Sequence, residues 1–444
     1  MMAILGFLTV IIMLTLVMSK KASPTVALIG VPIITGAIAS FFSTGETAYD
    51  ILGVGKFISS GIGTVAATGV MFIFSILFFG ILTDAGTFRP IIKKILGIIG
   101  TDPVKIAIGT AILAMIIHLD GSGAVTFLIC IPALLPVYDA VGMSRTTLAT
   151  IVALSAGTMN IVPWGGPTIR AATAMEMNVM DLFSPVIVPL IFGLFTVLVF
   201  AFILGKKEKK RLGEISASGV VVGEQELTAE QESLLRPEKF GVNIALILLA
   251  VVGLILGGKY GVKPEVVFMI SFVLSIVINY PDVKMQKARV DAHAKSAILM
   301  ASVLFAAGAF TGIMKGSGMI TAMSESLVAI IPESAAKFFA IITGIIAMPA
   351  SLLFDPDSFY FGVLPVLTST AQGFGIDGVS IARAAILGQM TTGFPVSPLT
   401  PATFLLIGLA GVDFGEHQRK TIPLAFTVTI VMLIVSVVIG AIVI

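Results

Sequence analysis

The sequence predicts an all-α protein that crosses the membrane many times and is built from two repeats of opposite orientation. The chain is 57% hydrophobic and only 12% charged, too little charge to cover the surface of a soluble protein of 444 residues. Apolar runs such as 4–18, 244–256 and 422–444 are typical of membrane-spanning helices. Polar breaks rich in Gly and Pro interrupt other apolar stretches at corresponding places in the two halves, which indicates an internal repeat.

We expect five spans and one re-entrant hairpin in each half. The first half contains spans at 2–18, 25–42, 61–83, 146–180 and 184–205, and a hairpin at 104–137. The second half contains spans at 239–257, 264–280, 297–314, 380–411 and 421–444, and a hairpin at 338–372. The hairpin arms are about 15 residues long, which is short for a crossing of about 20 and favours re-entry. The fourth span of each half is broken, at 160–168 and at 393–401.

Basic clusters predict the orientation of the two repeats, 1–205 and 239–444. Lys and Arg gather at 20–21, 89–94, 206–211, 284–295 and 419–420, all on one side of the predicted spans, and that side is cytoplasmic by the positive-inside rule. The halves then have inverted topology, with both termini extracytoplasmic. The segment 206–238 is a cytoplasmic linker whose charge runs we expect to be solvated. The stretch 84–103 is an interfacial amphipathic helix.

The two hairpin turns carry carboxylates inside apolar segments. Such groups are costly in hydrocarbon and persist where they line a cavity or bind something. We expect Asp120, Asp355 and Asp357 to bind a metal ion, unless the acids lie at a membrane edge. The remaining turn residues, expected to bind substrate, are Gly121, Ser122, Gly123 and Ser358.

The two broken helices supply further polar groups. The predicted substrate-binding residues are Asn160, Trp164, Gly165, Gly166, Thr168 and Arg170 in the first break and Thr392, Ser397 and Thr400 in the second. Arg170 could hold a carboxylate in bidentate fashion or reach toward the membrane interface. Trp164 could form a pocket wall or an interfacial anchor. Asn160 and the threonines could instead satisfy the backbone of the broken helices.

The donor set is rich in oxygen. It suits Mg²⁺, Ca²⁺ or Na⁺ better than thiophilic metals, and the single cysteine, Cys130, excludes an intramolecular disulfide. His118 is a candidate for proton coupling, with a structural role as the alternative.

A membrane-embedded hydrolase would need no inverted repeat, and the His-x-x-x-His type of ligand set is absent from the sequence. These features favour a secondary transporter.

The strings Asn160–Thr168 (NIVPWGGPT) and Leu119–Ala124 (LDGSGA), with the opening Met2–Phe7 (MAILGF), resemble the citrate–divalent metal–proton symporter (CitMHS) family over essentially the whole chain. The resemblance implies the ion transporter superfamily fold, and hence a homodimer with an elevator movement. It implies scaffold spans at 1–83 and 239–280 and transport elements at 104–180 and 338–411. The Ser-Asn-Thr signatures of related sodium-coupled symporters are absent, and aspartate-bearing turns occupy their places.

The resemblance therefore implies a symporter in the cell membrane that imports citrate as a complex with Mg²⁺ or Ca²⁺ and is coupled to protons. Asp120, His118 and Asp355 would be the proton-coupling residues. No prosthetic group, enzymatic activity or nucleic-acid partner is expected. The alternative is a proton- or sodium-coupled transporter of another small di- or tricarboxylate without metal.

Overall fold

The computed structural model describes residues 1–444 except 20, 45–47, 214–227, 258–259, 333–335 and 444. Regular structure in these described residues is helical, with no strand among them. Seven of the described helices are long and apolar enough to cross a membrane. The protein is therefore an all-helical, multi-pass membrane protein, as its composition predicts.

The helices fall into two series joined by a linker. The first series is α1 (Met2–Met18), α2 (Pro24–Ser40), α3 (Gly53–Asp84), α4 (Arg89–Ile99), α5 (Pro103–Ile117), α6 (Gly123–Val141), α7 (Arg145–Met159), α8 (Gly166–Ala174), α9 (Val179–Phe183) and α10 (Ile187–Leu212). The linker contains α11 (Ala229–Leu234). The second series is α12 (Phe240–Gly257), α13 (Pro264–Asn279), α14 (Val283–Gly316), α15 (Met319–Val328), α17 (Phe339–Ala350), α18 (Leu364–Gly373), α19 (Gly378–Ile386), α20 (Pro401–Ala410) and α21 (Phe414–Val438).

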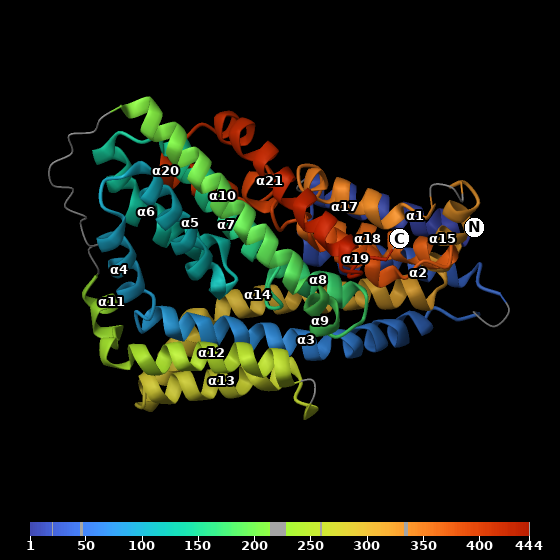
Figure 1. Ribbon diagram of the computed structural model, residues 1–444. Coiled ribbons are helices and arrows are strands. Elements are labelled where there is room, and N and C mark those ends of the chain that lie inside the picture. The colour runs from blue at the N-terminus through green and yellow to red at the C-terminus, as the bar shows by residue number, and fades with distance from the viewer. Residues whose placement is uncertain (20, 45–47, 214–227, 258–259, 333–335, 444) are drawn as a thin grey trace.

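The two series follow the same plan. In each, two shorter apolar helices precede a long helix (α3, α14), a short helix (α4, α15), a hairpin (α5–α6, α17–α18), a broken helix (α7–α8, α19–α20) and a closing span (α10, α21). In Figure 1 the N and C labels lie toward one end of the molecule, while α10 ends and α11 begins toward the other. This arrangement agrees with the inverted repeat expected from the sequence.

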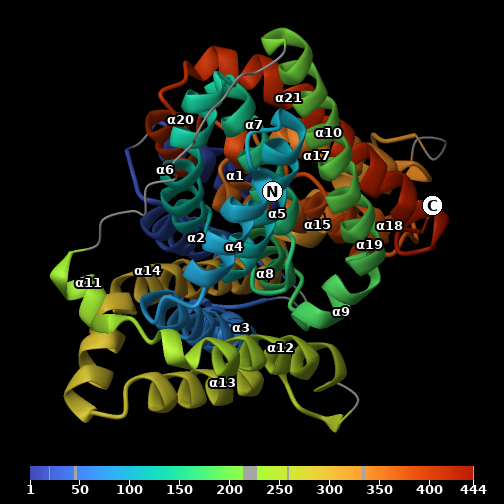
Figure 2. The same ribbon diagram turned by 60° about the vertical axis from the view of Figure 1, so that its left-hand side comes forward.

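Helices α3 and α14 pack along each other at backbone contact. A Cβ atom at Gly61 would lie 2.0 Å from the carbonyl oxygen of Gly308, and one at Gly312 would lie 2.2 Å from the carbonyl oxygen of Phe57. Glycine is needed here because only small residues let two helix backbones approach so closely. Figures 1 and 2 show α12 and α13 beneath this pair, on the side away from α5 to α8.

Some boundaries differ from the prediction. Helices α3 and α14 are 32 and 34 residues long, longer than the expected spans 61–83 and 297–314, because their helices continue into polar sequence. The first hairpin has arms of 15 and 19 residues, and the second starts with an arm of 12. Helix α4 forms within the predicted amphipathic stretch 84–103.

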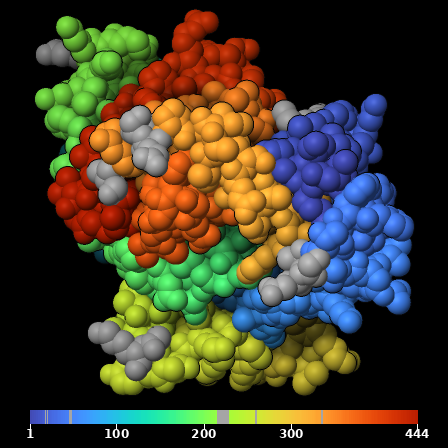
Figure 3. Space-filling view, turned by 90° about the vertical axis from the view of Figure 1, so that its right-hand side faces the viewer, coloured from blue at the N-terminus to red at the C-terminus, as the bar shows by residue number. Residues whose placement is uncertain are grey.

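Helix α15 was not expected from the sequence. It corresponds to α4 in the second series, and it packs against α1 and α18. Figure 3 shows this end of the molecule, where the dark-blue N-terminal helices lie against the orange second hairpin. The apolar face of α15 is thus covered by protein.

Candidate functional site

The first hairpin tip is built around a tight turn between α5 and α6. Gly121 has a φ of 76°, a left-handed conformation that glycine adopts without strain. The carboxylate of Asp120 accepts a hydrogen bond from the Ser122 backbone N–H at 2.8 Å. The Ser122 hydroxyl in turn accepts from the Val125 N–H at the start of α6. Oδ1 of Asp120 therefore orders the turn.

The second hairpin tip is also organised by an aspartate. Oδ1 of Asp355 accepts hydrogen bonds from the backbone N–H groups of Asp357 and Ser358, at 3.0 and 3.1 Å. The Ser358 hydroxyl donates to Oδ2 of the same carboxylate. Asp355 thus caps the helical residues 356–357 that lead into the π-helix at 358–363, and the Asp357 side chain is left for contacts with the rest of the protein.

Asp357 forms an ion pair with Arg170 across the two repeats. Arg170 Nε lies 2.7 Å from Asp357 Oδ1, and the two side chains are 9% and 11% exposed. The Arg170 guanidinium also donates to the backbone carbonyl of Gly166, at 3.2 Å, within α8. A cation from the first broken helix and a carboxylate from the second hairpin are therefore held together in a nearly dry environment.

The first break reaches both the first hairpin and the second break. Asn160 Nδ2 donates to the backbone carbonyl of Met390 at 2.8 Å, and its Oδ1 lies 3.4 Å from His118 Nε2. The other ring nitrogen of His118 is 2.8 Å from the hydroxyl of Thr126 in α6. His118 is fully buried, and its two ring nitrogens contact the first hairpin and the first break. The side chain therefore links these two elements.

Trp164 is buried and does not lie at the lipid-facing surface. Its indole N–H donates to the carbonyl of Leu119 at 2.7 Å, and its ring stacks on Phe79 and meets Phe268 edge-on. A Cβ atom on Gly121 would come within 3.0 Å of the indole. The interfacial-anchor interpretation is therefore wrong, and the side chain instead fixes the first break to the hairpin tip and to α3 and α13.

Several of the predicted hydroxyl groups bind the backbone of the breaks. Thr168 donates to the carbonyl of Ile161, Ser397 to that of Ser351, and Thr400 to that of Phe394. The hydroxyl of Thr392 pairs with that of Thr429 in α21 at 2.6 Å. Thr168 and Thr400 thus make the backbone contacts considered as their alternative role, and Ser397 does the same, whereas Thr392 bonds a side chain of the closing span.

The sequence interpretation missed an amide in the second break. Gln389 is fully buried, and its side-chain oxygen accepts a hydrogen bond from the Ser351 hydroxyl at 2.9 Å. The same hydroxyl accepts from the Met390 N–H, and the Tyr360 hydroxyl donates to the Gln389 carbonyl. The sequence does offer a signal for Gln389. It is a lone amide side chain within an apolar stretch, as Asn160 is in the first break.

The glycines of the tips and breaks are contact points. A Cβ atom on Gly123 would lie 2.6 Å from the ring of Phe394 in the second break, and one on Gly165 would lie 2.1 Å from the Asn160 carbonyl oxygen. Both hairpin tips and both breaks therefore converge on one region.

Among the described residues, no group of three or more His, Cys, Asp or Glu side chains is placed to hold a metal ion, so Asp120, Asp355 and Asp357 do not form a ready metal cluster.

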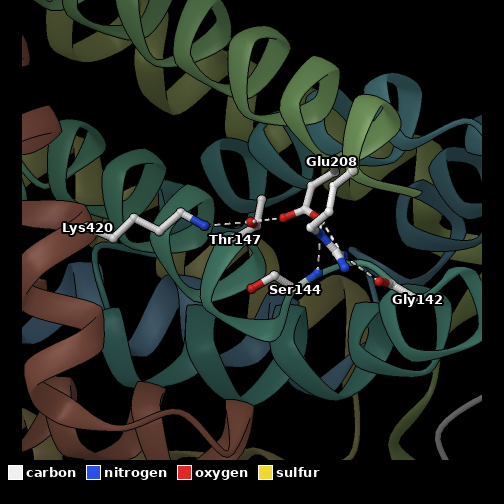
Figure 4. A network of polar contacts seen from close by, with 6 residues as sticks. Gly142, Ser144, Thr147, Glu208 and Lys420 are labelled. Carbon is white, nitrogen blue, oxygen red and sulfur yellow. Dashed lines mark hydrogen bonds and ion pairs between the residues drawn. The ribbon is translucent and has the colours of Figure 1, made fainter. Parts of the chain in front are cut away.

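A separate polar network fastens the start of the first broken helix to the closing spans (Figure 4). The Thr147 hydroxyl donates to Glu208 and accepts from the Lys420 ammonium, the latter at 2.7 Å. Arg211 bonds both Glu208 and the carbonyl of Gly142. The expectation that the charge run at 206–211 is solvated is wrong for Glu208, which is 6% exposed because it joins α7, α10 and α21.

Comparisons with known proteins agree across the whole chain. The sequence model of the CitMHS family, described as "Citrate transporter", matches residues 1–388. A protein of Bacillus subtilis (strain 168) named "Citrate transporter" is 42% identical over 442 residues, covering 100% of both chains. Another from the same organism, named "Mg(2+)/citrate complex secondary transporter", is 39% identical over 442 residues and covers 100% of this chain and 99% of its own.

A solved structure has the same fold. The YdaH transporter of Alcanivorax borkumensis superimposes with a TM-score of 0.63, covering 94% of this chain and 98% of its own. Its sequence identity is only 13%, so the likeness concerns the fold and does not extend to the substrate. The inverted repeat with hairpins and broken helices is thus found in a transporter of known structure.

Proposed function

Because the chain belongs to the citrate transporter family, we propose that it imports citrate as a complex with Mg²⁺ or Ca²⁺, in symport with protons and by an elevator movement. A relative that is 39% identical is named for the Mg²⁺–citrate complex, which supports the choice of cargo. The alternative is another small di- or tricarboxylate carried without metal and coupled to protons or sodium.

The buried pair of Arg170 and Asp357 is the observation that carries the proposal. A metal–citrate complex presents a free carboxylate next to a partly coordinated cation. The carboxylate can replace Asp357 as the partner of Arg170, and the cation can replace Arg170 as the partner of Asp357. The site therefore holds one positive and one negative group, as binding of such a complex requires.

The donor set explains why metal and citrate would travel together. The described residues provide no cluster of three acidic or imidazole ligands, so the citrate itself would supply most of the oxygens around the metal. A chelate of trianionic citrate with a divalent ion carries one negative charge, which tolerates the nearby aspartates better than free citrate does. Asp120 and Asn160 would line the opposite side of the cargo, from the first hairpin and the first break.

Uptake of labelled citrate into proteoliposomes tests the cargo and the coupling. We expect uptake to require Mg²⁺ or Ca²⁺, to stop when a chelator stronger than citrate is added, and to rise with an inward proton gradient. Replacing sodium by choline should leave the rate unchanged. Uptake that persists in the chelator would reject the metal–citrate complex and support the alternative, and uptake that depends on sodium would reject proton coupling.

The elevator movement can be tested at an ion pair between α14, which packs along the predicted scaffold helix α3, and the chain after the predicted transport helix α8. Lys315 at the end of α14 lies 2.6 Å from Glu176, which follows α8. In a Cys130→Ala background, which removes the sole native cysteine, K315C/E176C should be cross-linked by a bifunctional thiol reagent. Cross-linking should stop uptake, whereas each single cysteine treated with the same reagent should transport normally. Unchanged uptake in fully cross-linked protein would refute the movement.

A further inference from the structure

An ion pair joins the end of the first broken helix to the long helix of the second repeat. Lys315 Nζ, in the last turn of α14, lies 2.6 Å from Glu176 Oε2, two residues after the end of α8. Helix α8 also carries Arg170 of the candidate site, and it lies beside both α14 and α3 (Figures 1 and 2). The pair therefore connects the element that supplies Arg170 to a helix of the other repeat.

The backbone at Glu176 is left-handed, which is uncommon for a residue with a side chain. Its φ is 52°, and it closes α8 in a Schellman motif, because its N–H donates to the Thr173 carbonyl while the Met177 N–H donates to that of Ala172. The same hydrogen-bond pattern ends four other helices, each with glycine at the left-handed position: Gly86, Gly142, Gly375 and Gly411. Glu176 therefore stands where glycine is the residue that avoids strain.

The inverted repeat supplies an internal comparison for this position. Gly411 follows α20, the counterpart of α8, and closes that helix with the same two hydrogen bonds at a φ of 64°. The second repeat thus ends its broken helix without a side chain, whereas the first repeat keeps a carboxylate there at a conformational cost. What that carboxylate gains is the contact with Lys315.

The Lys315 end of the pair is fixed to α3. A Cβ atom on Gly316, the next residue, would lie 2.3 Å from the Phe57 ring of α3, and one on Gly312 would lie 2.2 Å from the Phe57 carbonyl oxygen. Lys315 is therefore carried by the part of α14 that packs closely on the predicted scaffold helix. Its side chain is 68% exposed and that of Glu176 is 20% exposed, so water weakens the pair and allows it to open and re-form.

We propose that the ion pair of Glu176 and Lys315 is a latch between α8 and α14, which favours the end state of the carrier in which these two helices lie side by side. This proposal rests on the elevator movement proposed above, in which α8 moves while α14 stays with α3. An exposed pair of this kind shifts an equilibrium by about 1.5- to fivefold. The latch therefore biases the distribution between the end states without blocking the movement, and variants that lack it should still transport.

Pulsed electron–electron distance measurements on spin-labelled protein test the latch. In a Cys130→Ala background, labels at K105C in α5 and K284C in α14 report the position of the first hairpin relative to α14, because both positions are exposed. We expect two distances, and E176Q and K315Q should each lower the ratio of the latched to the unlatched population about 1.5- to fivefold. E176K/K315E should restore the ratio, since it rebuilds the pair with the charges exchanged.

Two further variants separate the charge from the backbone. E176G gives the left-handed position its unstrained residue, so it should unfold at a higher temperature than E176Q and still lose the latch. R145Q breaks an exposed ion pair, Arg145 with Asp139, that lies wholly within the predicted transport elements, so it should leave the ratio unchanged. Ratios in E176Q and E176G equal to that of R145Q would overturn the latch alone. A single distance in R145Q, both with and without metal–citrate, would reject the elevator movement and the latch with it.

Discussion

Breaking the buried ion pair should separate the structural and binding roles of Arg170. In Arg170→Gln, the Asp357 carboxylate loses a partner at 2.7 Å while it stays 11% exposed. Removing one partner of a buried pair costs about 3–5 kcal/mol, because the remaining charge is left uncompensated. Adding Asp357→Asn removes that charge, so the double variant should regain most of the lost stability.

Transport should respond differently from stability. If Arg170 holds a citrate carboxylate, R170Q/D357N should be nearly as stable as the native protein in a thermal-unfolding assay in detergent and should still lose metal–citrate uptake. A charged hydrogen bond to the substrate contributes about 1.5–3 kcal/mol, which corresponds to a KM raised by roughly 10- to 150-fold. Arg170→Lys should not restore the KM, since an ammonium cannot reproduce the planar fork.

A matched control pair is available at the surface. Arg145 and Asp139 make two hydrogen bonds of 2.8 and 2.7 Å, with side chains 47% and 41% exposed. Because water already solvates both groups, Arg145→Gln should leave the melting temperature and the uptake unchanged within error. A native KM for citrate in the stable R170Q/D357N protein would refute the assignment of Arg170 to the substrate.

Three further predictions rest on single contacts. Gly123→Val should lower uptake at least tenfold without unfolding the protein, because the new side chain would meet an aromatic ring of the second break 2.6 Å from the Cβ position. Gly61→Leu should prevent stable folding, seen as aggregation in detergent chromatography, whereas Gly63→Ala, with nothing within 4 Å, should not. The Lys209 ammonium lowers the pKa of Asp102 below its ordinary 3.8, so this contact stabilises the fold above that pH and its contribution is lost as the pH falls through the lowered pKa. Asp102→Asn should abolish this component of the acid dependence in pH-resolved melting curves.

The repeat architecture could be predicted because its signals are local. Carboxylates, glycines and prolines within apolar runs mark the hairpin tips and the breaks, and the structure forms irregular backbone at each of them. The lengths of α3 and α14 could not be predicted in the same way. A hydropathy window finds the part of a helix that faces lipid, and polar helical turns such as 283–296 continue beyond that part.

The partners within the site were not predictable, since they depend on distant segments. Arg170 and Asp357 are 187 residues apart, and nothing in either local sequence indicates the other. Helix α15 was missed because its 10 residues are too few for a membrane span, and the prediction left the stretch after the span 297–314 unassigned. Aligning it with α4 through the inverted repeat would have found it.

The charges at the centre also suggest why protons should accompany the cargo. Arg170 and Asp357 neutralise each other, so under the proposed elevator movement these two groups would cross the membrane with no net charge when no cargo is bound. If the proposed complex binds between them, the same two groups would carry a cargo of net charge −1. Moving an uncompensated charge through a low-dielectric region is costly, and one proton taken up with each complex would restore neutrality. The loaded and empty carriers would then face comparable barriers, as a symporter requires if both are to cross.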